Sequence, residues 1–122
     1  MTAKGRHKKL TGKIGETLAA SYFELTGYEI LQHNWRYQRV EIDLIARKGN
    51  TVHFIEVKTR QSLRYGWPEE HIKRKKILRM MIAVEAYLQA AGGQPLVQLD
   101  ILSILVVDRQ PPVFWLIEDV FL

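Results

Sequence analysis

The 122-residue chain contains no cysteine, which excludes disulfide bonds, a cysteine-ligated zinc site and thiol catalysis. It also lacks a long apolar segment: the longest mainly apolar run, residues 101–107, spans 7 residues, whereas a bilayer-spanning helix needs about 20. No apolar stretch of the signal-peptide type follows the basic N-terminus. We therefore expect a cytoplasmic protein that does not associate with a membrane.

Acidic residues are outnumbered, with 13 Asp and Glu against 18 Lys and Arg, so the formal net charge is +5. The excess lies in residues 1–13, which contain no acid and hold Lys4, Arg6, Lys8, Lys9 and Lys13. A second basic cluster, within the balanced remainder of the chain, comprises Lys73, Arg74, Lys75, Lys76 and Arg79. Such clusters favour a polyanionic partner, most simply nucleic acid. The alternative is a solubilising tail with a solvated helix face.

No internal repeat, low-complexity segment or linker interrupts the chain, and 47% of its residues are hydrophobic and 25% charged. A chain of this length and composition can bury a core without a disulfide or a metal. We expect one folded domain, residues 12–122, preceded by a basic arm, residues 1–11.

The spacing of apolar residues predicts two helices and five strands. The helices are expected at residues 12–26 and 70–91, and the strands at residues 28–37, 40–47, 51–59, 96–107 and 113–117. The order α-β-β-β-α-β-β predicts an α/β fold with one mixed central sheet.

Each predicted helix has an apolar stripe that we expect to face the core. The stripes are Ile14, Leu18, Tyr22 and Leu25 in the first helix, and Ile77, Met81, Val84, Leu88 and Ala91 in the second. Glu16 lies away from its stripe, so we expect it on the surface or on a second packing face. On the second helix, we expect Lys73 and Lys76 to turn toward the sheet and Lys75 and Arg79 to point into solvent.

The second and third predicted strands carry four charged residues at matching positions. The strands join at Gly49-Asn50, a dipeptide suited to a two-residue hairpin turn. The resulting register places Asp43 opposite Glu56 and Glu41 opposite Lys58. Strand alternation then places all four side chains on one face of the hairpin.

Two acidic residues directly opposed across strands have Cβ atoms only about 4.5–5.5 Å apart, so their carboxylates repel each other. Asp43 and Glu56 therefore need a nearby cation, which Lys58 supplies in part. A divalent metal is the stronger candidate, because hard oxygen ligands suit Mg²⁺ or Mn²⁺. The alternative is a polar, solvent-facing side of the hairpin, although Ile45 and Phe54 share this face.

Several short motifs surround these acids. They are Gly12-x-x-Gly15-Glu16-x-x-Ala19-x-x-Tyr22, Gly27-Tyr28-x-Ile30-Leu31, Asn34-x-Arg36, Glu41-Ile42-Asp43-Leu44-Ile45-Ala46 and Phe54-x-Glu56-Val57-Lys58-x-Arg60. Asp43 with Glu56-Val57-Lys58 resembles the Asp…(Asp/Glu)-x-Lys signature of restriction-endonuclease-like nucleases. The larger set resembles the YraN-like family, small bacterial proteins with a restriction-endonuclease-like fold.

The resemblance implies roles for particular residues. It implies that Asp43 and Glu56 bind a metal, that Glu16 is a further acid at that metal, and that Lys58 positions or activates the attacking water. Lys76 and Asp100 match a lysine of the long helix and an acid of the fourth strand. Two positions depart from the family pattern: Val40 stands where a glycine is usual, and Gln98 where an arginine is frequent.

We therefore expect a nuclease that uses Mg²⁺ or Mn²⁺ and catalyses through Asp43, Glu56 and Lys58. The residues expected to contact phosphates, most simply those of DNA, are Arg60, Lys73, Lys76, Lys8 and Lys9. No base-reading element is evident, so selectivity for nucleic-acid structure is expected. The alternatives are a non-catalytic nucleic-acid-binding module on the same fold and a partner-binding adaptor. The apolar segments 114–117 and 121–122 leave a homodimer open beside plain core packing.

Overall fold

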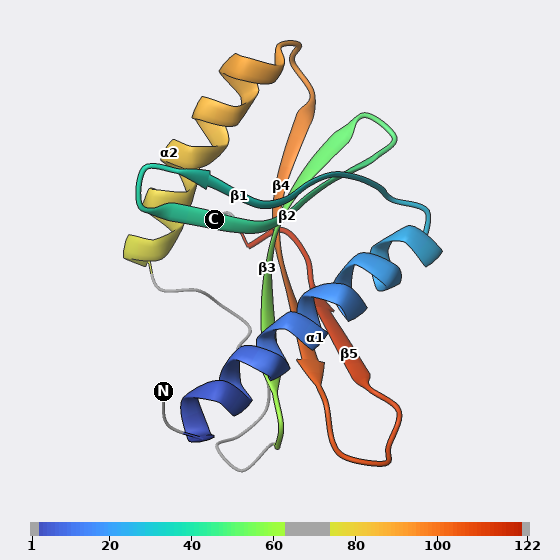
Figure 1. Cartoon of the computed structure of the whole chain (residues 1–122). Coiled ribbons are helices and arrows are strands. Elements are labelled where there is room, and N and C mark those ends of the chain that lie inside the picture. Colours follow the sequence, from blue (N-terminus) through green and yellow to red (C-terminus); the bar gives the residue numbers. More distant parts are fainter. Residues whose placement is uncertain (1–2, 63–73, 121–122) are drawn as a thin grey trace.

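The computed structural model describes residues 3–62 and 74–120, with side chains from residue 12 onward. Its elements are α1 (Ala3–Leu25), β1 (Glu29–Tyr37), β2 (Val40–Lys48), β3 (Thr51–Arg60), α2 (Arg74–Ala91), β4 (Leu96–Leu105) and β5 (Val113–Ile117) (Figure 1). The predicted order of helices and strands is confirmed. Residues 70–73 of the second predicted helix lie outside the described residues.

The five strands form one sheet in sequential order, β1-β2-β3-β4-β5. Strands β3 and β4 are parallel and the other neighbours are antiparallel, so the sheet is mixed as expected. The parallel pair needs a crossover connection, and α2 lies within it. Neither described helix combines the length and the apolarity needed to cross a membrane.

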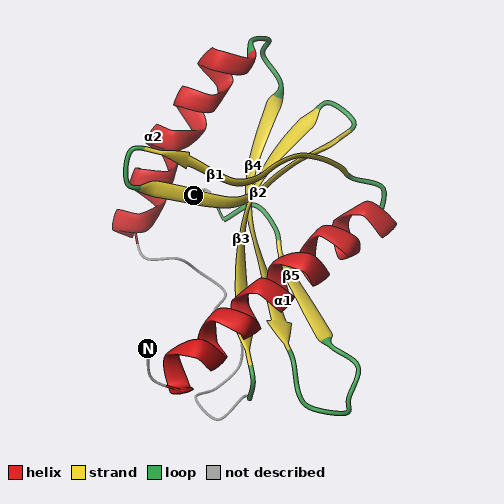
Figure 2. Ribbon diagram, viewed as in Figure 1, coloured by secondary structure: helices red, strands yellow, loops and turns green. Residues whose placement is uncertain are grey.

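The two helices cover opposite faces of the sheet (Figure 2). Alternate residues of β3 separate into two cores, in which Phe54 packs with α2 and Ile55 packs with α1. Phe114 of β5 stacks on Tyr22 of α1, with 5.0 Å between the ring centroids, so this part of the apolar segment 114–117 serves intramolecular packing.

The predicted core stripes of both helices are confirmed only in part. Five of their residues do pack against the cores, namely Leu18, Tyr22, Ile77, Val84 and Leu88, but the most buried face of each helix is rotated from the predicted stripe. In α1, Ile14 is 49% exposed and Leu25 87% exposed, whereas the buried face is Gly15, Ala19 and Phe23. In α2, Met81 is exposed, and the buried residues are Met80, Ala83 and Val84. The small residues mark the contact faces, because a short side chain lets the helix approach the sheet closely.

Helix α1 begins at Ala3, nine residues before the predicted start. The backbone of the basic segment is therefore continuous with the helix that carries Glu16. The segment predicted to be a separate basic arm, residues 1–11, is therefore part of α1 from residue 3 onward.

The predicted hairpin register of β2 and β3 is confirmed from Lys48–Thr51 to Leu44–Ile55. Beyond that pair the strands part, and Figure 1 shows the β1–β2 hairpin turning toward α2 while β3 continues beside α1. Ile42 joins the same core as Ile45, three residues away, so strand alternation is interrupted between them. This fork in the sheet lies at Asp43.

Candidate metal centre

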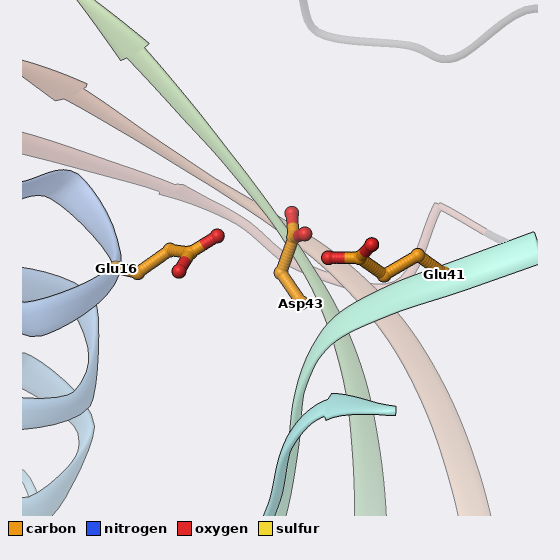
Figure 3. A group of neighbouring side chains, drawn as sticks. All are labelled: Glu16, Glu41 and Asp43. Atoms are coloured by element: carbon orange, nitrogen blue, oxygen red, sulfur yellow. The ribbon is translucent and has the colours of Figure 1, made fainter. Parts of the chain in front are cut away.

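Three carboxylates from α1 and β2 converge at the fork. Glu16 projects from α1, and Glu41 and Asp43 project from β2 (Figure 3). One oxygen of each side chain lies within 4.8 Å of the other two. Figure 3 shows Asp43 between its neighbours, with Glu16 reaching toward it from the helix and Glu41 from the strand.

Close packing of α1 on β3 places Glu16 in this group. A Cβ added to Gly15 would overlap Oγ1 of Thr59 and lie 3.0 Å from its Cβ. Any side chain at position 15 would therefore hold the helix farther from the strand. Of the two positions expected for Glu16, the surface or a second packing face, the structure shows the packing face. Glu16 lies there because Gly15 lets α1 approach β3 closely.

Asp43 has a perturbed acidity. Its pKa is raised to about 6, first by burial and then by the negative charges of Glu56, Glu16 and Glu41, against a lowering by the hydrogen bond from the Val57 N–H. That N–H donates to Asp43 Oδ2 at 2.8 Å. An ionised Asp43 is thus held at a cost that a bound cation would offset.

Glu56 lies beside this group but outside the three-acid cluster. Its Oε1 accepts a hydrogen bond from Lys76 Nζ of α2, and its side chain is only 12% exposed. Within the described part of the chain, its buried Oε2 has no hydrogen-bond partner. The expected direct opposition of Asp43 and Glu56 was wrong, because the pairing of β2 with β3 ends one position earlier.

Of the remaining predicted site residues, the structure describes some with their side chains and others only in part or not at all. Lys58 and Arg60 are half-buried on β3, two and four residues after Glu56, and alternation places them on the Glu56 side. Lys76 does turn toward the sheet, and it contacts a carboxylate. Lys73 lies outside the described residues. Lys8 and Lys9 lie in the helical backbone of α1, but their side chains are outside the description.

Two residues of the site were missed as site residues from the sequence. Glu41 was grouped with Asp43 only by strand alternation, and Asn34 only as part of a motif. Glu41 Oε2 accepts from Arg36 Nη2 at 2.7 Å. The amide of Asn34 lies between Glu16 and Glu41, at hydrogen-bond distance from both. The sequence feature that could have identified both residues is the Asn34-x-Arg36 motif, because it lies on β1, the strand that pairs with β2.

Asp100 belongs to a separate buried cluster. His53 Nδ1 lies 2.7 Å from Asp100 Oδ2, and Asp100 Oδ1 accepts from Gln98 Nε2 at 3.0 Å and from the Asp119 N–H at 2.9 Å. Asp100 is fully buried, and these contacts satisfy both of its oxygens. Gln98, one of the two departures from the family pattern, thus supports Asp100 directly.

The donor set of the fork suits a hard divalent cation. Glu16, Glu41 and Asp43 offer carboxylate oxygens, which Mg²⁺ and Mn²⁺ prefer. Burial and neighbouring acids raise the pKa of Asp43, and the buried Oε2 of Glu56 has no hydrogen-bond partner among the described residues, so both carboxylates would gain from a bound cation. The residues present therefore fit such an ion.

Comparison with known proteins places the chain in a family. The profile described as "Uncharacterised protein family UPF0102" matches residues 15–104, a span that includes all the acids of the fork. A UPF0102 protein of Christiangramia forsetii is 42% identical over 99 residues, which cover 81% of this chain and 82% of the relative. A UPF0102 protein of Flavobacterium johnsoniae is 46% identical over 82 residues, covering 67% of this chain and 66% of the relative. The resemblance to the YraN-like family is thereby confirmed, and the chain belongs to family UPF0102.

Proposed function

We propose that the chain is a metal-dependent nuclease with a restriction-endonuclease-like fold. It would hydrolyse phosphodiester bonds of nucleic acid. The observation that carries this proposal is the convergence of Glu16, Glu41 and Asp43 at the fork, with Glu56 and Lys58 on the adjacent strand.

Asp43, Glu16 and Glu41 would hold a Mg²⁺ or Mn²⁺ ion, with Glu56 as a further ligand on the neighbouring strand. When bound, such an ion lowers the pKa of a coordinated water and stabilises charge on phosphoryl oxygens. The ammonium group of Lys58 would orient the attacking water or neutralise charge that develops in the transition state. Asp43 would be ionised at neutral pH, because its pKa of about 6 lies below 7.

The basic residues would supply affinity for the phosphate backbone. Helix α1 carries both the basic segment and Glu16, so contacts made by Lys8 and Lys9 would be rigidly connected to the metal site. Arg60 and Lys73 would contact phosphates as well. Lys76 is assigned a different role, since its contact with Glu56 makes it a local counter-charge in the site. We propose a cytoplasmic protein acting on DNA, selective for structure and not for sequence.

One observation favours the second candidate, a non-catalytic nucleic-acid-binding module. The contact of Lys76 with Glu56 already neutralises one of the acids that a metal would need. In that case the basic segments would bind nucleic acid without turnover. A cleavage assay distinguishes the nuclease from the non-catalytic binding module.

The test incubates the protein with branched, single-stranded and double-stranded DNA and RNA, in Mg²⁺ and in Mn²⁺. We expect cleavage of at least one substrate, abolished by a chelator and reduced about 100-fold or more in Lys58→Ala. Lys75→Ala is the matched control, because Lys75 is exposed on α2, and it should cleave as the wild type does. Binding without cleavage in either metal would instead establish the non-catalytic module.

A further inference from the structure

The backbone of Asn34 is unusual for a residue in a strand. Its φ is +48°, in the left-handed region that residues other than glycine seldom adopt, although asparagine does so more readily than most. The register of β1 with β2 pairs His33 with Leu44 and Trp35 with Ile42, which brings Asn34 level with Asp43. The unusual residue therefore lies at the fork.

The side chain of Asn34 connects the helix to the strand. In one orientation of the amide, Nδ2 donates to Glu16 Oε2 at 3.4 Å. In the orientation that satisfies both ends of the amide, Nδ2 donates to Glu16 Oε1 at 3.2 Å and to Glu41 Oε1 at 3.1 Å. A primary amide nitrogen carries two hydrogens, so it can serve two carboxylates at once without adding charge.

Glu41 has a donor on each of its oxygens. Arg36 occupies Oε2 and Asn34 reaches Oε1, so the side chain of Glu41 is fixed from both sides. Glu16, which reaches the fork from α1, accepts a hydrogen bond from the same amide. The amide thus contacts an acid of α1 and an acid of β2 together.

We propose that Asn34 is a positioning residue that presets Glu16 and Glu41 around Asp43 for a divalent cation. This inference rests on the proposed metal site, and it adds a residue that acts through the carboxylates without touching the ion. The left-handed backbone aims the amide at both acids. Without the amide, the carboxylates of Glu16 and Glu41 should repel each other and move apart. Binding a cation would then require bringing them together again, which lowers the affinity for the cation.

The test is calorimetric titration of Mn²⁺ into the full chain without nucleic acid, together with melting in a chelator. In Asn34→Gly the backbone keeps its left-handed φ and the amide is lost, so we expect about tenfold weaker Mn²⁺ binding and little change in metal-free melting. Asn34→Ala also removes the amide and should show the same loss of affinity. Gln38→Gly is the matched control, because Gln38 is exposed and has a φ of +54°, and it should bind Mn²⁺ as the wild type does.

The outcomes separate this inference from the proposed function. Equal Mn²⁺ affinity in the wild type and both Asn34 variants would overturn the role of Asn34 and leave the metal site standing. Equal weakening by Asn34→Gly and Gln38→Gly would also overturn it, because the effect would then follow the backbone and not the amide. A wild type that binds no Mn²⁺ would refute the metal site itself.

Discussion

Substitution of Gly15 by alanine tests whether the close contact of α1 with β3 positions the site. In an unobstructed helix, replacing glycine by alanine stabilises by about 1 kcal/mol. At position 15 the new Cβ would overlap Thr59 Oγ1 and lie 3.0 and 3.1 Å from Thr59 Cβ and Cγ2. Rotation of the threonine could move Oγ1 but not its Cβ, so α1 must shift.

Overpacking of this kind costs about 1–3 kcal/mol, which outweighs the gain in helix propensity. We expect Gly15→Ala to lower the free energy of unfolding by about 1–2 kcal/mol, measured by urea denaturation with a chelator present. Gly12→Ala is the matched control in the same helix. Nothing lies within 4 Å of its added Cβ, so it should stabilise by up to about 1 kcal/mol.

A double-mutant cycle with Thr59→Ala makes the test specific. Removing Oγ1 and Cγ2 of Thr59 should reduce the cost of Gly15→Ala, because only the 3.0 Å contact with Thr59 Cβ then remains. Because α1 carries Glu16, Gly15→Ala should also weaken Mn²⁺ binding, whereas Gly12→Ala should not. A Gly15→Ala variant as stable as Gly12→Ala would refute the inferred contact.

Three further substitutions test the electrostatics of the fork and its surroundings. Asp43 has a pKa of about 6 in the fold, above its ordinary 3.8, so its ionisation costs stability above pH 6. Asp43→Asn should therefore be more stable than the wild type at pH 8 in a chelator, by on the order of 2 kcal/mol, and this difference should fall away between pH 6 and 4 in chemical denaturation. Lys76→Met should lower metal-free stability by about 1 kcal/mol and increase the rise in melting temperature caused by Mn²⁺, because Glu56 loses its counter-charge; Lys75→Met should do neither. Asp100→Ala leaves buried His53 and two part-buried donors, Gln98 and the Asp119 N–H, without their partner, so it should lower the free energy of unfolding by about 3 kcal/mol in urea denaturation. Mn²⁺ affinity of the folded protein should not change, because Asp100 lies outside the metal site.

The sequence predicted the order of elements and the β2–β3 register because both depend on local signals. Apolar alternation defined the strands, and Gly49-Asn50 fixed the turn from which the register could be counted. The buried faces of the helices were predicted only in part, because the stripe of the largest apolar residues was taken for the core. Gly15 and Ala19 lie against the sheet, whereas Ile14 is half-exposed.

The composition of the site was predictable only in part. Asp43 and Glu16 were identified, the latter through family resemblance, and the structure brings them together. Counting pairs could not foresee that β2 would leave β3 at Asp43, where the strand pairing ends and Glu41 joins Asp43 and Glu16. The left-handed backbone of Asn34 is likewise a property of the folded fork, since asparagine in a strand sequence does not specify its φ.

Melting of the wild type and Asp43→Asn, with and without millimolar Mn²⁺, tests the central claim most directly. A cation that binds only the folded state raises stability by about 2.7 kcal/mol at 100 times its dissociation constant. We predict a clear rise for the wild type and none for Asp43→Asn, with exposed Glu85→Gln as the control that behaves like the wild type. A wild-type melting temperature unchanged by Mn²⁺, or an equal rise in Asp43→Asn, would contradict the proposed metal centre.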